Sequence, residues 1–280
     1  MGMFRAATVA LFGLLVCAGS AHAAGPRQGQ LGLNLAIGQD IPVNGSMHEG
    51  IDNTYPNIGL IFPSLNGQSG RAIIGARSYD DFYGPTLLYR LDATWAHSDN
   101  LEFLIQVSHT EGDSDRLQIG TLAVPSGGAA APLYARFSPY RSTALEAGVR
   151  AWLGERGNRF RPYTTLRLGA ARTDGISATF SAPDLNSGDT QVPFYDDTTS
   201  ATGGIDFGVA YEVARARNHS VELGAEIGFR YTGALDENDT VLGGIDGASL
   251  NDKSGRVSVP VTLSARVRWG GSSNQSASRF

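Results

Sequence analysis

Residues 257–269 alternate strictly between two kinds of side chain. One parity is apolar throughout: Val257, Val259, Val261, Leu263, Ala265, Val267 and Trp269. The other parity is polar apart from one proline: Ser258, Pro260, Thr262, Ser264, Arg266 and Arg268. A period of two places alternate side chains on opposite faces of a β-strand. The segment therefore predicts a long strand with an apolar face and a charged opposite face, a combination that few environments accommodate.

The same alternation occurs in seven earlier segments: residues 30–38, 83–97, 101–109, 142–153, 160–172, 201–213 and 221–231. Three connections between the eight segments are short (98–100, 154–159 and 214–220), and four are long (39–82, 110–141, 173–200 and 232–255). Short and long connections alternate along the chain, which is typical of a membrane-spanning antiparallel meander. The segments are long enough to cross a bilayer as tilted strands.

The polar faces of these segments carry thirteen charged residues. Seven are acidic and six are arginines: Asp92, Glu102, Glu146, Asp206, Glu212, Glu222, Glu226, Arg90, Arg150, Arg167, Arg230, Arg266 and Arg268. A lipocalin-like barrel or a sandwich would turn the apolar faces inward, but eight such faces would overfill its core. A membrane barrel turns them to lipid and pairs the charges inside. We favour the membrane barrel, which also leaves no open sheet edge in lipid.

The aromatic residues of the apolar faces gather at the two ends of the predicted strands. Trp95, Phe103, Phe160, Tyr211 and Trp269 fall near the turn end, and Tyr83 and Tyr231 near the loop end. Two aromatic girdles are expected where a barrel meets the two membrane interfaces. The chain is therefore predicted to be all-β: an eight-stranded antiparallel up-and-down transmembrane β-barrel with short periplasmic turns and four long extracellular loops.

The N-terminal segment has the pattern of a secretory signal peptide. Arg5 precedes an apolar stretch at 6–18, and Ala21-His22-Ala23 has the small-residue spacing of a cleavage site before Ala24. We expect residues 1–23 to be the signal peptide, 24–269 the barrel and 270–280 a polar tail. The only cysteine, Cys17, lies in the first segment, so the mature chain has no disulfide. Its acidic balance argues against nucleic-acid binding.

The chain resembles the small outer-membrane β-barrels of the OmpA type found in Gram-negative bacteria. The resemblance covers residues 29–269 and rests on the signal peptide, the eight strands, their connections and the aromatic end of the last strand. Three segments are similar to those of family members: Arg161-Pro162-Tyr163, Phe194-Tyr195-Asp196-Asp197 and Ser258-Val259-Pro260-Val261. The resemblance implies location in the cell outer membrane, contact with its lipid and lipopolysaccharide, and insertion by the barrel-assembly machinery. Many members end at the last aromatic, whereas a polar tail follows Trp269 here.

The barrel interior is predicted to be closed by its own charges. Eight strands leave a lumen that side chains just fill, and lone buried charges are costly, so the thirteen groups should pair as a structural network. If Leu153 and Phe160 face each other across their turn, Glu146 lies opposite Arg167, and the two should form an interior ion pair. The same reasoning at the next turn places Glu212 opposite Glu222, with Arg266 or Arg268 between the carboxylates.

No catalytic, cofactor-binding or metal site is predicted. Ser108 and His109 lie near the outer rim, but adjacent strand residues point to opposite faces and cannot form a nucleophile–base pair. The acidic residues of loops 173–200 and 232–255 do not have the spacing of an EF-hand. The apolar stretch Ile58–Phe62 could pack locally, fold over the barrel mouth or contact a partner.

We therefore expect a monomeric, non-enzymatic barrel whose function lies in its loops. The preferred role is structural or surface interaction: membrane integrity, adhesion, or recognition of a surface or host ligand. A narrow porin-like channel for small solutes is the alternative, and a lipid A-modifying enzyme is a third reading.

Overall fold

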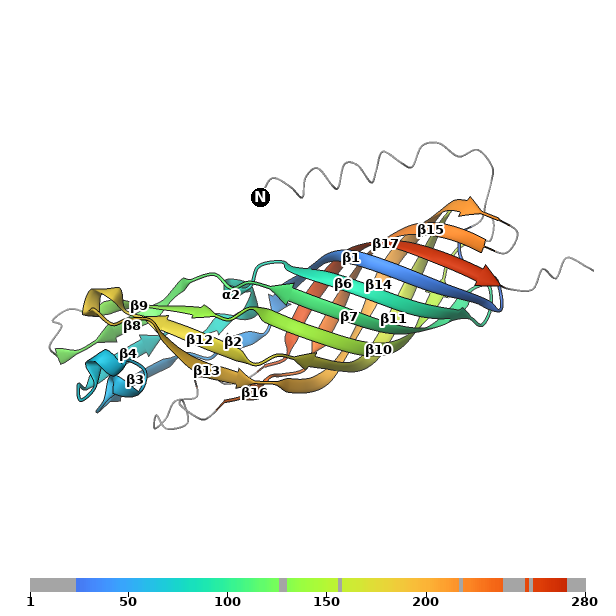
Figure 1. The fold of residues 1–280 in the computed structure, drawn as a ribbon. Coiled ribbons are helices and arrows are strands. Elements are labelled where there is room, and N and C mark those ends of the chain that lie inside the picture. The colour runs from blue at the N-terminus through green and yellow to red at the C-terminus, as the bar shows by residue number, and fades with distance from the viewer. Residues whose placement is uncertain are drawn as a thin grey trace, which may run out of the picture.

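In the computed structural model, eight long strands close into one antiparallel barrel (Figure 1). In wall order they are β1 (Gln30–Asn44), β17 (Arg256–Gly270), β15 (His219–Thr232), β14 (Thr198–Arg215), β11 (Phe160–Thr173), β10 (Tyr140–Trp152), β7 (Leu101–Gly112) and β6 (Thr86–Ala96). The structure describes residues 24–125, 130–155, 158–216, 219–238, 250–251 and 254–270. The predicted signal peptide and the tail beyond residue 270 lie outside this part of the chain.

The barrel turns its apolar face outward. In β11, Leu168 is 67% exposed while its neighbour Arg167 is buried, and in β7, Ile105 is 61% exposed while Gln106 is buried. A closed barrel with an exposed apolar band is the form that strands take in lipid. The predicted orientation, with charges inside and apolar residues outside, is confirmed. Within the described residues, no helix is both long and apolar enough to span a membrane.

The long connections all leave the barrel at one end, but they are not irregular loops. Seven short strands form a second sheet: β3 (Ile51–Tyr55), β4 (Gly70–Ile74), β8 (Leu117–Ala123), β9 (Ala131–Phe137), β12 (Ile176–Ser181), β13 (Thr190–Asp196) and β16 (Asp236–Glu237). The strand order of this sheet follows the strand order of the barrel wall. Each short strand continues the course of one barrel strand, in the order β16 after β15, β13 before β14, β12 after β11, β9 before β10, β8 after β7, β4 before β6 and β3 after β1. We call this sheet and its connections the extension, which Figure 1 shows at the end away from the short turns.

Smaller elements complete the extension. The strands β2 (Ser46–His48) and β5 (Arg77–Ser78) pair with each other, and the one-turn helix α2 (Tyr79–Phe82) follows directly. Short 3-10 helices of the extension lie at Ile58–Leu60, Pro63–Leu65 and Pro183–Leu185.

An aromatic core fills the extension. The rings of Phe82 and Phe137 meet edge to face with centroids 4.6 Å apart, and Phe137 meets Phe194 at 5.0 Å. Ile58 and Phe62 are buried in the same core, so the apolar stretch of the first long connection packs locally. Burial of this apolar surface stabilises the extension as a folded unit rather than a set of mobile loops.

Tyr83 departs from its predicted place. It precedes β6, is only 1% exposed, and donates a hydrogen bond from its hydroxyl to the Ser138 carbonyl at 2.8 Å. The prediction that Tyr83 belongs to the lipid-facing girdle is therefore wrong. The alternation starts at Thr86, three residues later, because the preceding helix α2 directs the chain into the extension core.

The register across the β10–β11 turn also differs from the prediction. Glu146 lies opposite Gly169, and Arg167 lies opposite Gly148, two positions from the predicted partner. Leu153 and Phe160 both face outward, but β10 ends at Trp152, opposite Tyr163, so β11 extends further than its neighbour. At the next turn, Glu212 lies opposite Glu222 as predicted.

Candidate functional site

All thirteen predicted interior charges are buried inside the barrel. Three more charged residues join them: Asp40, Arg161 and Arg256. Within the described part of the barrel, the buried charges are thus eight carboxylates and eight guanidinium groups. This balance matters because a buried ion without a partner costs several kcal/mol, roughly 3–5 when one member of a pair is removed.

The layer nearest the short turns is organised around Glu102 and Glu222. Arg268 binds both carboxylates, with its Nε 3.2 Å from Glu222 Oε2. Arg266 Nη1 lies 3.3 Å from the same Glu222 oxygen, so both predicted arginines contact this carboxylate. The indole of Trp152 donates to Glu102 at 2.7 Å. Glu212, which faces Glu222, pairs with Arg215 instead, and the two facing carboxylates thus have separate cationic partners.

The middle layer is a continuous ion-pair network. Arg150 Nη2 lies 3.4 Å from both Asp92 Oδ2 and Glu226 Oε1. Arg90 also pairs with Glu226, and its Nη1 lies 3.7 Å from Asp206 Oδ2. Because each arginine contacts more than one carboxylate, the charges lock several strands of the wall together across the lumen.

The next layer shows why Glu146 and Arg167 form no ion pair. Gln106 stands between them: its Nε2 donates to Glu146 at 2.8 Å, and its Oε1 accepts from Arg167 at 2.7 Å. Arg167 pairs with Asp206, and Glu146 pairs with Arg230. The predicted direct pair is wrong, because the amide of Gln106 separates the two groups.

The layer beneath the extension was not predicted from the sequence. Asp40 and Arg256 meet at 2.7 Å, and the Arg256 guanidinium lies 4.7 Å from the centre of the Tyr140 ring. The sequence pattern could have predicted both charges. Asp40 continues the polar side of the alternation beyond residue 38, and Arg256 lies two residues before Ser258, on the same polar side. A polar cavity of about 10 Å³ lies here, lined in part by Ser108, Thr110 and both arginines of this end, Arg230 and Arg256.

Both ends of the lumen are covered. At the turn end, the backbone N–H of Gly25 donates to Glu222 at 2.8 Å and that of Gln28 donates to Asp99 at 2.7 Å, so residues 24–29 cross the opening. At the other end lies the aromatic core of the extension. The lumen is therefore filled by side chains along its length and covered at both mouths.

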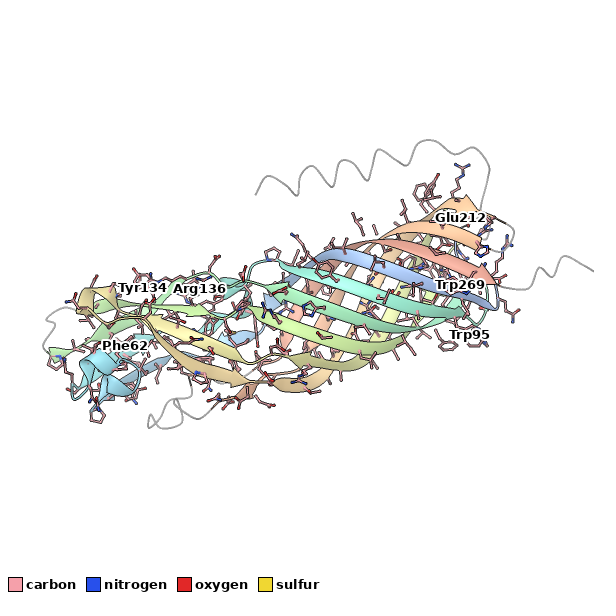
Figure 2. The ribbon with its side chains drawn as sticks, viewed as in Figure 1. Phe62, Trp95, Tyr134, Arg136, Glu212 and Trp269 are labelled. Carbon is pink, nitrogen blue, oxygen red and sulfur yellow. The ribbon has the colours of Figure 1, made fainter. Side chains whose placement is uncertain are left out.

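The remaining aromatic residues of the predicted girdles lie on or near the outward face. Trp95 stacks on Phe103 with centroids 5.9 Å apart, and Phe160 meets Tyr211 at 4.7 Å. Figure 2 shows Trp95 and Trp269 at the turn end of the barrel. Tyr231 is exposed near the extension. Six of the seven residues predicted for the girdles thus lie on or near the outward face, and their position at the membrane interfaces stays a prediction.

Two histidines bear on possible chemistry. Ser108 points into the lumen, whereas His109 lies on the outer side with its Nδ1 3.0 Å from Thr143 Oγ1, so the two do not approach each other. His48 is buried in the extension, where its ring lies 5.9 Å from that of Phe82. Burial, aided by the positive charge of Arg77, lowers the pKa of His48 to about 4. It is a neutral core residue at physiological pH.

A closed eight-stranded barrel with an apolar exterior and an ion-paired interior defines the class: a membrane-spanning β-barrel of the outer-membrane type. Neither a family model nor a curated protein sequence matches the chain.

Solved structures of similar fold include three surface or outer-membrane proteins. The neisserial surface protein NspA shares 18% identity, covering 86% of this chain and 95% of its own, with a TM-score of 0.36. OprG of Pseudomonas aeruginosa shares 10% identity, covering 89% of this chain and 99% of its own, with a TM-score of 0.40. Ail, the attachment invasion locus protein of Yersinia pestis, shares 10% identity, covering 86% of this chain and 99% of its own, with a TM-score of 0.35.

Proposed function

We propose that this protein is a non-catalytic anchor that acts through its extension, in surface attachment or recognition at the outer face of the outer membrane. The observation that carries the proposal is the contrast between a filled lumen and a folded extracellular sheet. The barrel offers solutes no open path, whereas the extension presents a rigid surface outside the cell. Rigid elements hold a binding surface better than mobile loops.

The filled lumen predicts that the protein does not conduct. Arg150, Arg167 and Arg268 occupy the barrel interior, each paired with carboxylates from other strands. Opening a path would require several buried ion pairs to separate together, at roughly 3–5 kcal/mol for each broken pair. Purified protein in planar bilayers should give no stable conductance steps in molar salt, with a general porin as the positive control. Reproducible steps would instead support the narrow channel.

The role of the extension can be tested on living cells. A deletion strain is complemented with the full chain or with a variant in which residues 51–74 are replaced by a short Gly-Ser turn. This change removes the β3–β4 hairpin but none of the barrel strands. We expect the variant to insert, as judged by heat-modifiable migration, and to lose attachment to surfaces. Equal attachment of both complemented strains would show that the extension is not the interacting part.

Membrane integrity is measured in parallel by uptake of a large dye. If dye uptake rises in the deletion strain and is corrected by both complements, the barrel alone supports the envelope. That result would replace the attachment role by a purely structural one.

A further inference from the structure

Two exposed arginines of the extension differ from the other exposed arginines of the long connections and the barrel rim. Arg71, Arg141 and Arg172 each pair with a carboxylate, those of Asp52, Glu111 and Asp197, at 2.8, 2.8 and 3.2 Å. Within the described residues, Arg116 and Arg136 have no carboxylate partner. Arg116 donates to the Ser181 hydroxyl at 2.6 Å, and Arg136 to the Ser114 carbonyl at 3.3 Å. Neither guanidinium thus forms an ion pair with a described carboxylate, that of Asp115 beside Arg116 in the chain included.

The strands β8, β9 and β12 bring these arginines to one outward face. Tyr134 and Arg136 are alternate residues of β9, about 7 Å apart along the strand. Leu133 and Ala135, which have the opposite parity in the same strand, are buried. Gln118 of β8 lies opposite Tyr134. Figure 2 shows Tyr134 and Arg136 on the extension, far from the turn end of the barrel.

The same face is completed from the neighbouring strand. Thr179 and Ser181 of β12 lie opposite Arg136 and Tyr134. The guanidinium of Arg116 lies over the Tyr134 ring, 4.8 Å from its centre. We call Arg116, Gln118, Tyr134, Arg136 and Thr179 the arginine face. It is held by a buried apolar layer beneath it, so its side chains project from a fixed backbone.

The chemistry of this face fits an acidic sugar. A guanidinium binds sulfate or carboxylate oxygens through its planar N–H edges, and stacking on an aromatic ring leaves those edges available. Tyr134 offers an amphipathic ring for the C–H face of a pyranose. Gln118 and Thr179 supply donors and acceptors for sugar hydroxyls. A simple inorganic anion would need only the arginines.

The charge of the surrounding extension restricts where such a ligand can approach. Residues 45–85, 113–139, 174–197 and 233–255 contain sixteen acidic and five basic residues. The net charge of these segments repels a polyanion, which is attracted where Arg116 and Arg136 lie together without an ion-paired carboxylate among the described residues. Arg77, which donates to the Gln118 carbonyl at 3.2 Å, is a further cation without such a partner. We propose that the arginine face binds an acidic polysaccharide outside the cell. This inference rests on the proposed function and names the class of ligand that the extension recognises.

Binding is tested with the purified full-length protein in detergent micelles, titrated with dextran sulfate and with uncharged dextran of equal length. We expect dextran sulfate alone to bind, more weakly as NaCl rises from 50 to 500 mM, because ion pairing is screened. The double variant R116Q/R136Q should bind at least ten-fold more weakly. The matched control R71Q removes an exposed arginine that already has a carboxylate partner, and its affinity should stay within two-fold of the original.

Tyr134 tests the sugar itself. Y134A should weaken binding several-fold, while Y134F, which keeps the ring, should not. Equal affinity of the original chain and R116Q/R136Q, or an equal loss in R71Q, would overturn the site. Polyglutamate binding as tightly as dextran sulfate would overturn the saccharide and indicate an acidic protein partner instead.

The outcome separates from that of the proposed function. If R116Q/R136Q loses dextran sulfate but neither it nor the hairpin deletion changes cell attachment, the site stands and the attachment role fails. If the hairpin deletion abolishes attachment while R116Q/R136Q binds dextran sulfate normally, the attachment role stands and this site fails. Heat-modifiable migration confirms that each variant is folded, as expected for changes at exposed residues.

Discussion

The barrel and the extension share one continuous wall but have opposite interiors. Inside the barrel lie Arg150 and Glu102, and outside it lies Leu168; inside the extension lies Phe137, and outside it lies Arg136. The pleat is the same in both, so the strand pattern alone does not decide which face is buried. The surroundings decide: lipid accepts the apolar face, and water accepts the polar one. The inversion occurs near Tyr140, which contacts the last lumen arginine, Arg256.

The largest expected effect is in the barrel. R268A leaves Glu102 and Glu222 buried without their shared cation. We expect a loss of about 3–5 kcal/mol in the free energy of unfolding, measured by urea titration in lipid vesicles with tryptophan fluorescence. The double variant R268M/E102L should recover part of this loss, since it removes one charge of each sign. If R268A unfolds like the original chain, the lumen charges do not hold the wall.

The corresponding change in the extension should act locally. F137A opens a cavity where Phe137 meets Phe82 and Phe194, and we expect a local cost of about 3 kcal/mol. Limited proteolysis should then cut the extension while a membrane-protected barrel fragment remains. Simultaneous loss of both parts would show that the two regions fold as one cooperative unit.

Acid should distinguish the two interiors as well. The pKa of His48 is about 4 in the folded extension, against 6.5 for an exposed histidine. The unfolded chain therefore binds this proton first, and the stability of the extension should fall as pH drops from about 6.5 to about 4, by roughly 3 kcal/mol. H48F should remove that slope. Protease resistance measured across this pH range checks both statements, and an identical slope in H48F would assign the effect to another group.

The smallest effect is expected where an ion pair lies in water. Arg71 and Asp52 are both more than half exposed. Exposed pairs contribute little, because solvent already screens each charge. D52N should leave the unfolding midpoint unchanged within error, in contrast to R268A. A clear drop would mean that this pair fixes the β3–β4 hairpin.

The sequence predicted the eight barrel strands and their facing because each extends over many residues of strict alternation. The sequence did not predict the extension sheet or the register between β10 and β11. The extension strands are short, and the pairs β4–β8 and β9–β12 each join strands from different long connections, so no local pattern specifies their sheet. The register of β10 and β11 depends on how their turn is built, and Leu153 and Phe160 both face outward without being opposite each other. Glu146 and Arg167 were misplaced for that reason.

The sequence predicted which charged residues lie in the lumen better than it predicted their ion-pair partners. Parity assigns a side chain to a face but gives no information about which group lies across the barrel. Arg268 reaches Glu102 from β17, a strand that does not adjoin β7 in the wall. Such contacts depend on the diameter of the closed barrel.

The pairing of β1 with β17 has a consequence for biogenesis. Leu31 faces Trp269, so the seam of the wall joins the first and the last strand of the barrel. A nascent chain that stops before β17 retains two unpaired strand edges, however complete the rest of it is. Closure of the wall therefore requires synthesis of the last strand. Only a chain that includes β17 can form a barrel in which every backbone hydrogen-bonding group of the wall is paired.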